Sequence, residues 1–473
     1  MSPDASSAAP STPGAVTVHP GWHYHFLGIG GVGMSALAEL LHRRGVRVSG
    51  SDSAASPTLE RLAALGIPVT VGHDSGALNG VDAVVFTPAV SPRHPIWSEV
   101  QRRGLPRIHR AALLGAVTLG RPTLAVAGTH GKTTSTAALG YALERAGWDP
   151  TVLVGGHVSQ FGGRNCRLGE GAWCVVEADE SDASFVQLAP QGVLITNIEA
   201  DHLDHHGTLE NLVDAFRAFI GRLDPAGVLV YCADDPIARR LGQERRGRTL
   251  AYGTGAGADV RVEVGTLRPG AMEMTLTQDG GRERLTTRLV GRHNALNLAG
   301  VLALAQAAGA PRAPLLAALA DFQGVERRQQ FLGTCGAGGC AVFDDYGHHP
   351  TEIRATLEMF LAVYGEPLTV VFQPHLYSRT AFFADGFAEA LRPATRVFVT
   401  EVYAAREEPL PGVSGRMIVE RLAGHPAAQF VRNWQELVPR LSGAEAPRNV
   451  LLTLGAGDIT GLGPALLRAC GRP

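Results

Sequence analysis

Short apolar runs alternate with longer amphipathic stretches along this chain, and glycine-rich or proline-rich turns divide them into three blocks. In the first block the pattern predicts a strand that enters a glycine turn at 25–33, a helix at 34–44, a strand at 46–52 and another strand at 81–88. The block closes near Gly120. This alternation of strands and helices is typical of an α/β sheet.

The second block is longer and ends in a different pattern. A buried strand at 122–127 precedes a helix at 134–146, and a meander of shorter alternating runs at 250–289 precedes an Ala/Leu-rich helix that opens at Gly291. Between these lie further predicted strands at 151–155, 172–177, 192–197 and 227–232. Helical segments separate them, which favours a mostly parallel sheet.

The third block follows a turn at Gln323-Gly324 and returns to the alternation of strands and helices. Its strands are predicted at 341–345, 368–372, 396–400, 429–432 and 450–454. Each ends in a polar or glycine-containing loop, and ligands of open parallel sheets bind beyond the carboxyl ends of the strands.

The three blocks predict an α/β protein of three domains. We expect a Rossmann-like N-terminal domain at 21–120 and a central domain at 121–323, built like a phosphate-loop ATPase around a mostly parallel sheet. A Rossmann-like C-terminal α/β domain follows at 324–473. Residues 1–20, rich in Ala, Ser and Pro, are predicted to be a disordered tail.

Composition excludes several classes of protein. The net charge is −2, from 42 basic and 44 acidic residues without a long run of one sign, so neither nucleic acid nor a membrane surface is expected as a partner. No apolar run reaches the ~18 residues of a membrane-spanning helix. The six cysteines, Cys335 and Cys470 among them, lack metal-binding spacing, so we expect reduced thiols in a cytoplasmic protein.

One lysine stands against 41 arginines, and it lies in Gly128-Thr129-His130-Gly131-Lys132-Thr133-Thr134. A lysine retained against such a bias indicates a need for a compact ammonium group. Strand, glycine-rich loop and helix are the context of a phosphate loop, in which the Thr133 hydroxyl can bind Mg²⁺. The first glycine of the usual pattern is missing, because Val126 holds its place. The alternative is a glycine turn with an exposed lysine.

The glycine turn of the first block has the form G-x-G-x-x-G, with Gly28, Gly30 and Gly33. Asp52 ends the next strand, nineteen residues after Gly33, where dinucleotide-binding units place a ribose contact. The pattern therefore indicates a ligand with a diphosphate. A tight turn from strand to helix also needs glycine without any ligand.

Acids and histidines follow two strands of the second block. They lie in Glu177-Ala-Asp-Glu-Ser-Asp182 and in the segment 197–206, which contains His202. Both should lie on the same side of the sheet as Thr133, where they would form a ligand set for one or two divalent ions. Mg²⁺ prefers oxygen ligands. A zinc site made by the histidines and a solvated acidic loop without metal are the alternatives.

Nine motifs, in order between residue 25 and about residue 460, resemble the Mur ligase family of cytoplasmic peptidoglycan synthesis. They are GIGGVGMSALAELL, SGSD, AGTHGKTT, EADESDASF, TNIEADHLD, GRHNALN, DDYGHHPTEI, QPHLYSRT and VYAAREEPLPG. The resemblance implies that ATP phosphorylates the carboxylate of UDP-N-acetylmuramate and that the amine of L-alanine then attacks the acyl phosphate. Because an anion attacks an anion in the first step, Lys132 and two Mg²⁺ ions must neutralise both partners.

The resemblance also implies which residues act. Catalytic roles fall to Lys132, His202, Arg328, His348 and Arg379, with His349 beside His348 at the amino acid. ATP contacts fall to Gly128, Thr129, His130, Gly131, Lys132, Thr133, Thr134, His293, Asn294, Arg328 and Asp345. Contacts with the nucleotide sugar are implied for Gly28, Gly30, Gly31, Gly33 and Asp52. Thr133 and Glu177 match the site of the first Mg²⁺, and His202 that of the second. His348 and His349 could equally be strand-end caps.

The chain departs from the family pattern at several positions. Gln329 replaces a usual aromatic residue, Leu376 a common arginine, Leu203 a methionine and His205-His206 a Thr-Tyr pair. In sister enzymes a carbamylated lysine follows the metal-binding histidine and helps to hold the second Mg²⁺. No lysine follows His202 here, so we expect that ion to rely on His202, water and substrate oxygens.

Other functions stay open at this point. A recycling ligase that attaches a tripeptide to the same nucleotide sugar is the nearest alternative. A dinucleotide-dependent oxidoreductase and a non-enzymatic nucleotide switch are more distant ones. We expect a monomer or weak homodimer that works by closing the C-terminal domain on the central domain near Gln323-Gly324.

Overall fold

The computed structural model describes residues 16–72, 74–91, 93–336 and 338–471. Most of the predicted tail at 1–20 therefore lies outside the described residues. The chain forms two compact units. The first ends at Arg121 and also includes Ser184–Ala189, and the second comprises Pro122–Ala183 and the chain from Pro190 onward.

The first unit contains a five-stranded parallel sheet in the order β3-β2-β1-β4-β5. The strands are β1 (His23–Leu27), β2 (Arg47–Asp52), β3 (Val69–Val71), β4 (Ala83–Phe86) and β5 (Arg107–His109). The helices are α1 (Val32–Arg43), α2 (Pro57–Ala64), η1 (Ser75–Leu78), α3 (Ile96–Arg102) and α4 (Arg110–Thr118). The predicted strand-turn-helix-strand unit is confirmed, whereas β3 and β5 were not predicted.

A short segment from the middle of the chain completes this unit. The 3₁₀ helix η3 (Ser184–Gln187) packs on α4. The approach is so close that a Cβ on Gly115 of α4 would lie 2.6 Å from the carbonyl oxygen of Gln187. Glycine at this position therefore allows the two backbones to meet.

The second unit contains a ten-stranded sheet in the order β15-β14-β13-β12-β11-β10-β6-β9-β7-β8. Pairing is parallel from β13 to β7 and antiparallel at both margins. The strands are β6 (Thr123–Ala127), β7 (Thr151–Val158), β8 (Arg164–Arg167), β9 (Cys174–Glu177), β10 (Gly192–Ile195), β11 (Val228–Cys232), β12 (Arg248–Gly253), β13 (Val260–Arg268), β14 (Ala271–Gln278) and β15 (Gly281–Thr287). The mostly parallel centre and the meander are both confirmed.

A second sheet of the same unit has six strands in the order β16-β17-β21-β18-β19-β20. All pairs are parallel except β16 with β17. The strands are β16 (Gln330–Cys335), β17 (Cys340–Asp345), β18 (Leu368–Phe372), β19 (Arg396–Val399), β20 (Ala428–Phe430) and β21 (Val450–Leu454). The predicted C-terminal α/β sheet is confirmed, and β16 adds an edge strand that was not predicted.

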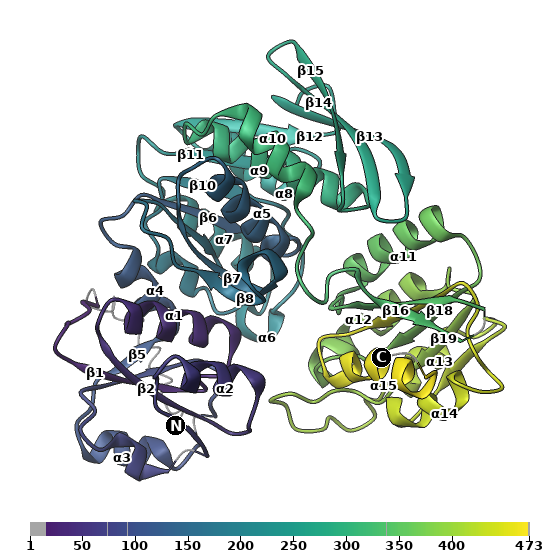
Figure 1. The fold of residues 1–473 in the computed structure, drawn as a ribbon, viewed down its shortest axis with the longest axis horizontal. Helices are drawn as coiled ribbons and strands as arrows, with labels where there is room; N and C mark the ends of the chain where they lie inside the picture. Colours follow the sequence, from purple (N-terminus) through teal and green to yellow (C-terminus); the bar gives the residue numbers. More distant parts are fainter. Residues whose placement is uncertain (1–15, 73, 92, 337, 472–473) are drawn as a thin grey trace, which may run out of the picture. The chain divides into compact units, whose positions relative to one another are not determined.

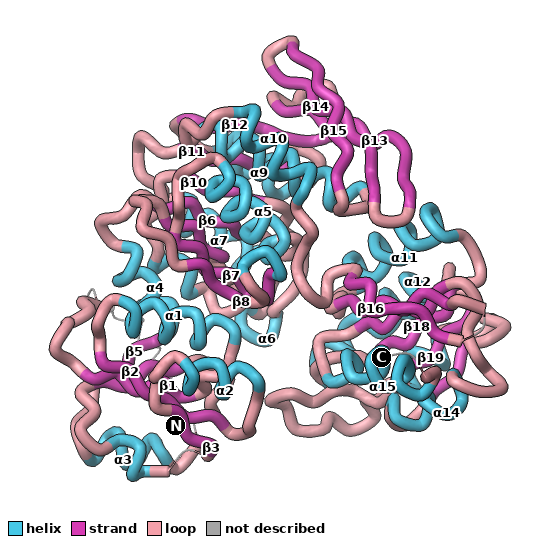
Figure 2. The backbone as a smooth tube through the Cα atoms, in the orientation of Figure 1, coloured by secondary structure: helices cyan, strands magenta, loops and turns pink. Residues whose placement is uncertain are grey.

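Helices follow many of the strands of both sheets along the chain (Figure 1). Those of the ten-stranded sheet are α5 (Lys132–Arg145), η2 (Ser159–Phe161), α6 (Leu203–His206), α7 (Leu209–Ile220), α8 (Pro236–Glu244), α9 (Arg292–Ala307) and α10 (Arg312–Asp321). Those of the six-stranded sheet are α11 (Pro350–Tyr364), α12 (Tyr377–Leu391), α13 (Arg416–Arg421), η4 (Trp434–Glu436), α14 (Leu437–Leu441), η5 (Asp458–Gly461) and α15 (Leu462–Ala469). The tube view in Figure 2 shows β13, β14 and β15 continuing beyond the helices as a strand-only extension.

Two helices of the ten-stranded sheet are largely buried in its core. In α5 and α9, buried residues occupy almost every position after the first turn. Small residues let these helices pack closely, because a Cβ on Gly140 would lie 2.6 Å from Val152 and one on Gly300 would lie 2.8 Å from Leu194. This packing fixes the first turn of α5, where the phosphate loop ends.

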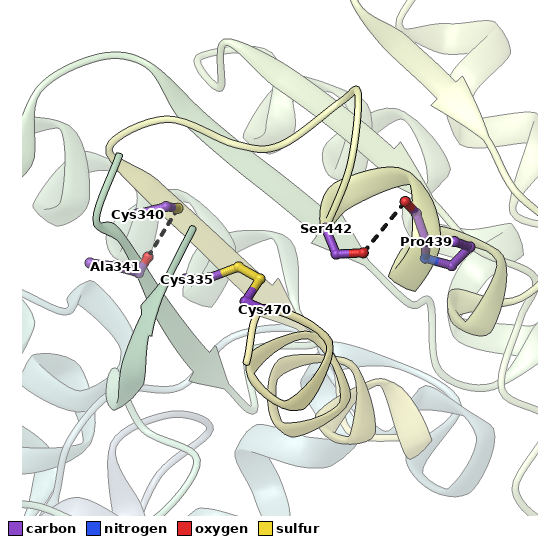
Figure 3. Close-up of a disulfide and its surroundings, with 6 residues drawn as sticks. All are labelled: Cys335, Cys340, Ala341, Pro439, Ser442 and Cys470. Atoms are coloured by element: carbon purple, nitrogen blue, oxygen red, sulfur yellow. Dashed lines mark hydrogen bonds between the residues drawn. A yellow bond between two sulfur atoms is a disulfide. The ribbon is translucent and has the colours of Figure 1, made fainter. Parts of the chain in front are cut away.

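The prediction of reduced thiols throughout is wrong for Cys335 and Cys470, which form a disulfide with a Cα–Cα distance of 5.7 Å (Figure 3). The two residues are 135 positions apart and meet because α15 packs on β16. A contact made by the fold leaves no spacing pattern in the sequence. Cys166, Cys174, Cys232 and Cys340 are free and buried.

Among the described residues, no helix has the combined length and apolar character needed to cross a bilayer.

Candidate active site

The predicted phosphate loop joins β6 to α5. Gly128 and Gly131 adopt φ angles of +134° and +79°, which other residues rarely adopt. A Cβ would also lie 2.0 Å from Thr196 Oγ1 at Gly128 and 2.6 Å from Asn297 Oδ1 at Gly131. The loop therefore needs glycine at both ends. His130 N donates to Asn197 Oδ1 at 2.8 Å, which holds the loop against the end of β10.

Lys132, the single lysine, is the first residue of α5, and its side chain turns back under the loop. Its Nζ donates to the carbonyl oxygens of Gly128 at 2.6 Å and Thr129 at 3.0 Å, and to Glu180 Oε1 at 2.8 Å. Burial lowers the pKa of Lys132, but the charges of Glu180 and Asp179 outweigh this effect and leave it above its ordinary value. The ammonium is therefore cationic at the position that a phosphate loop requires.

Glu180 is the partner of Lys132 that the sequence interpretation did not single out. Burial raises the pKa of this carboxyl to about 7, against the opposing effect of Lys132. Its Oε2 is buried and has no hydrogen-bond partner among the described residues. A buried carboxylate oxygen without a partner is costly unless a cation or water meets it.

The predicted ligands of the first metal lie together. Thr133 Oγ1 donates to Glu177 Oε1 at 2.8 Å, and Gly155 N donates to Glu177 Oε2 at 2.6 Å. A Cβ at position 155 would lie 2.7 Å from that carboxylate, so a larger residue there would displace Glu177. Glu177, Asp179 and Glu180 all raise the pKa of the one ammonium, so negative charge is in excess around Lys132.

The third predicted ligand, His202, has a left-handed backbone (φ +53°) just before α6. Burial, assisted by the charges of Arg379 and Lys132, lowers the pKa of His202. The imidazole is therefore neutral at pH 7, as a metal ligand must be. At the end of α6, His206 Nε2 donates to the carbonyl oxygen of Glu180 at 2.8 Å, so this short helix is tied to the acidic segment.

Beside the phosphate loop lies a cavity of about 320 Å³. Residues of both sheets line it, including His130, Thr133, His293, Asn294, Arg328, Gln329, Asp345 and Glu352. The cavity thus brings together most of the residues that the sequence assigned to ATP.

The Gln329 side chain is bonded to His293 and Asn294, which line one side of the cavity. Its side-chain amide bonds His293 Nε2 at 2.9 Å and accepts from Asn294 Nδ2 at 3.4 Å. Its backbone N donates to Asp345 Oδ2 at 2.8 Å. The departure from an aromatic residue at this position therefore gives the cavity a polar hydrogen-bonding group.

Asp345 and Arg328 face the cavity from the six-stranded sheet. Burial raises the pKa of Asp345 to about 6, although Arg328 opposes the shift. Arg328 lies over the Tyr346 ring, 5.1 Å from its centroid, and pairs with Glu352 Oε1 at 3.2 Å. Asp345 and Arg328 are thus held at the cavity by contacts with residues in and beside the six-stranded sheet.

The two neighbouring histidines of the HHP segment differ in role. His348 Nδ1 donates to the Tyr346 carbonyl oxygen at 3.0 Å, and burial lowers the pKa of His348 to about 3. His349 is the N-cap of α11: its Nδ1 accepts from Thr351 N at 3.3 Å, and its Nε2 donates to the Ala200 carbonyl oxygen at 3.2 Å. His349 therefore caps the start of a helix, whereas the alternative drawn from the sequence was a strand-end cap.

The five predicted residues of the nucleotide-sugar site lie in the first unit. Gly28 has a φ of +77°, and a Cβ on Gly30 would lie 2.9 Å from Asp52 Oδ2. Gly30 N donates to that oxygen at 2.9 Å, and Asp52 Oδ1 accepts from Ser53 N at 2.8 Å. Asp52 thus braces the glycine turn from the end of β2. A Cβ on Gly33 would lie 3.0 Å from Arg110 Nη1, so a larger residue there would require the arginine side chain to shift.

Three family models match consecutive parts of the chain. The catalytic-domain model of the Mur ligase family matches residues 23–121, the Mur ligase middle domain 126–305, and the Mur ligase glutamate ligase domain 327–457. Together with the phosphate loop and its cavity, these matches define an ATP-using ligase. The chain belongs to the Mur ligase family.

Individual members of the family are similar to the chain to different degrees. The chain is 44% identical over 459 residues to UDP-N-acetylmuramate–L-alanine ligase of Mycolicibacterium vanbaalenii, covering 94% of this chain and 95% of the relative. The crystal structure of the UDP-N-acetylmuramate-alanine ligase of Thermotoga maritima is 31% identical, with a TM-score of 0.81, and covers 94% of this chain and 98% of that one. A UDP-N-acetylmuramate:L-alanyl-γ-D-glutamyl-meso-diaminopimelate ligase structure from Neisseria meningitides is 28% identical, with a TM-score of 0.59, over 65% of this chain and 100% of that one.

Proposed function

We propose that this protein ligates L-alanine to the carboxylate of UDP-N-acetylmuramate, with ATP converted to ADP and phosphate, in peptidoglycan precursor synthesis. The observation that carries the proposal is the cavity in which the phosphate loop, Arg328 and Asp345 meet. The specific substrates come from relatives at 31% and 44% identity that cover nearly the whole chain.

The chemistry proceeds in two steps. A carboxylate oxygen of UDP-N-acetylmuramate attacks the γ-phosphorus of ATP, the bond to the β-phosphate oxygen breaks, and ADP leaves. The amine of L-alanine then attacks the acyl carbon, loses a proton, and expels phosphate with the former carboxylate oxygen. Activation is required because a carboxylate is a poor electrophile. The acyl phosphate reacts with the amine because phosphate is a good leaving group.

The chain's own cations serve the first step. Lys132 and Arg328 are both partly buried and held in place by several contacts, so they are positioned to stabilise charge on the phosphoryl group. Neutral His348 and the Arg379 side chain lie on the side of the six-stranded sheet, where we place the amino acid.

The site fits magnesium. Thr133 Oγ1, Glu177 and the unpartnered Glu180 Oε2 are hard oxygen ligands, and the carboxylates exceed the one ammonium in charge. Thr133 and Glu177 would hold one ion and His202 a second. When bound, Mg²⁺ would neutralise phosphate charge during transfer.

The first unit is proposed to bind the UDP part of the sugar nucleotide. Gly28, Gly30, Gly31 and Gly33 would leave room for a diphosphate at the turn before α1, where the start of a helix favours an anion. Asp52 would belong to this site, where it also braces the turn by accepting from Gly30 N and Ser53 N. We retain three functional domains, at 21–120, 121–323 and 324–473, in a cytoplasmic monomer or weak homodimer.

A tripeptide-adding recycling ligase is the second candidate, because one of the relatives carries that activity in its name at 28% identity. Phosphate release with UDP-N-acetylmuramate and ATP distinguishes the two. We expect release with free L-alanine and little with L-alanyl-γ-D-glutamyl-meso-diaminopimelate. Release with the tripeptide alone would instead assign the recycling function, and NAD reduction without ATP turnover would assign neither.

A further inference from the structure

Glu352 lies where the first turn of α11 meets the ATP cavity. Pro350 starts the helix and His349 caps it, so Glu352 is an acid in the first turn, where the helix dipole favours negative charge. Its side chain is only 10% exposed and lines the cavity.

Both oxygens of Glu352 are already engaged. Oε1 pairs with Arg328 Nη1 at 3.2 Å and with His130 Nδ1 at 3.3 Å. Oε2 accepts from His348 N at 3.0 Å. The three partners belong to three different segments: the phosphate loop, the segment before β16 and the turn before α11.

We propose that Glu352 is a positioning residue, which holds the phosphate loop through His130, the Arg328 guanidinium and the His348 backbone in one arrangement around ATP. The inference rests on the proposed function only for its turnover measurement. Glu352 acts through these groups, because both of its oxygens are bonded to them.

His130 connects Glu352 to a second carboxylate. Its Nε2 bonds Glu199 Oε1, and Glu199 Oε2 accepts from Thr351 Oγ1 of α11 at 2.9 Å. The phosphate loop is therefore attached twice to α11, once through Glu352 and once through Glu199 and Thr351. Such a double connection fixes the relative position of the loop and Arg328.

His130, Glu199 and His349 also lie close enough together to hold a metal ion, with ligand atoms within 4.8 Å of one another. The contacts argue against that use. Both ring nitrogens of His130 face carboxylates, and both ring nitrogens of His349 face backbone groups, the Ala200 carbonyl and Thr351 N. The cluster is closed by its own hydrogen bonds and forms a positioning network.

Substitution of Glu352 tests the proposal by two independent measurements. Glu352→Gln keeps the shape but removes the charge that holds Arg328 and His130. We expect the Kd of a non-hydrolysable ATP analogue to rise about tenfold, as for the loss of a charged hydrogen bond. In turnover assays, we expect kcat to fall about 100-fold, because the groups that position the reactants would be displaced. The KM for UDP-N-acetylmuramate should stay within about twofold.

The matched control is Glu358→Gln, an exposed acid on the same helix, which should change neither quantity. A double-mutant cycle with His130→Gln isolates this contact: Glu352 also holds Arg328 and His130 also bonds Glu199, so the combined loss should be smaller than the product of the two single losses but larger than either. Thermal unfolding of each variant monitors folding. Wild-type affinity for the analogue in Glu352→Gln, fully multiplicative losses, or a loss that follows the unfolded fraction would overturn the proposal. Because analogue binding does not involve alanine, a wild-type protein without alanine-dependent turnover would refute only the proposed function.

Discussion

Arg379 and Asp201 form a buried ion pair. Arg379 Nη2 and Nε donate to the same oxygen of Asp201, at 2.7 and 3.2 Å, and each side chain is 6% exposed. Asp201 precedes His202 directly, whereas Arg379 lies on α12. The pair therefore ties the segment that carries a candidate metal ligand to the six-stranded sheet.

Removing one partner of this pair should destabilise the second unit. Asp201→Asn leaves the Arg379 guanidinium buried without its counter-charge, and breaking a buried pair in this way typically costs about 3–5 kcal/mol. We expect a fall of this size in the free energy of unfolding, measured with urea. Asp204→Asn breaks the exposed pair with Arg406 and should cost less than about 1 kcal/mol. Equal losses of unfolding free energy in the two variants would contradict the conclusion that burial makes the pair of Arg379 and Asp201 important for stability.

Lys132→Arg should abolish most activity and keep the fold. The broader guanidinium cannot occupy the space under the loop where the ammonium donates to Gly128, Thr129 and Glu180. Loss of such an electrostatic contact lowers kcat by about 10²–10³. Turnover and circular-dichroism melting, measured on one preparation, check this. Near-normal turnover would show that a compact ammonium is unnecessary.

Much of the fold follows from periodicity because buried parallel strands are continuous apolar runs. The runs at 368–372 and 450–454 coincide with β18 and β21. Strand β8 was missed because Arg164–Arg167 is polar, and β3 because three residues carry too little pattern. Edge strands such as these are specified by their neighbours more than by their own residues.

The candidate site was predictable where a local motif encodes it and not where the fold does. Glycine positions and the lone lysine predicted the phosphate loop with Thr133, the strand end predicted the acidic cluster that begins at Glu177, and the family resemblance paired these two residues. The contact between His130 and Glu352 joins residues 222 positions apart by number, and no spacing rule describes it. From the sequence, Gln329 could be interpreted only as a departure from the family pattern. In the structure, its side chain bonds both His293 and Asn294.

His130 should make stability depend on pH on the alkaline side. Burial lowers its pKa, but hydrogen bonds to Glu199 and Glu352 prevail and raise it to about 9. The stabilisation is fully present below about pH 6.5, the ordinary value, and is lost as the pH rises through about 9. The melting temperature should therefore fall over this window in the wild-type protein.

His130→Gln provides the comparison for that pH dependence. Its melting temperature should be lower near neutral pH and should change less between pH 6.5 and 9, because glutamine does not titrate. Parallel pH profiles for the two proteins would mean that His130 does not carry the effect.

The enzyme should be insensitive to dissolved carbon dioxide. Lys132 is the only lysine in the chain, and its ammonium is engaged with Glu180, so no lysine is available to become a carbamate metal ligand. Turnover in buffer stripped of bicarbonate should equal turnover after bicarbonate is restored. Reversible loss of activity on stripping would show that a carbamate is required.

Oxygen transfer tests the acyl-phosphate account most directly. UDP-N-acetylmuramate labelled with ¹⁸O in its carboxylate is incubated with ATP, Mg²⁺ and L-alanine, and the released phosphate is analysed by mass spectrometry. Attack of the carboxylate on the γ-phosphorus predicts one ¹⁸O atom in each phosphate, formed only when L-alanine and the sugar nucleotide are both present. Unlabelled phosphate in the presence of ligated product would contradict the account.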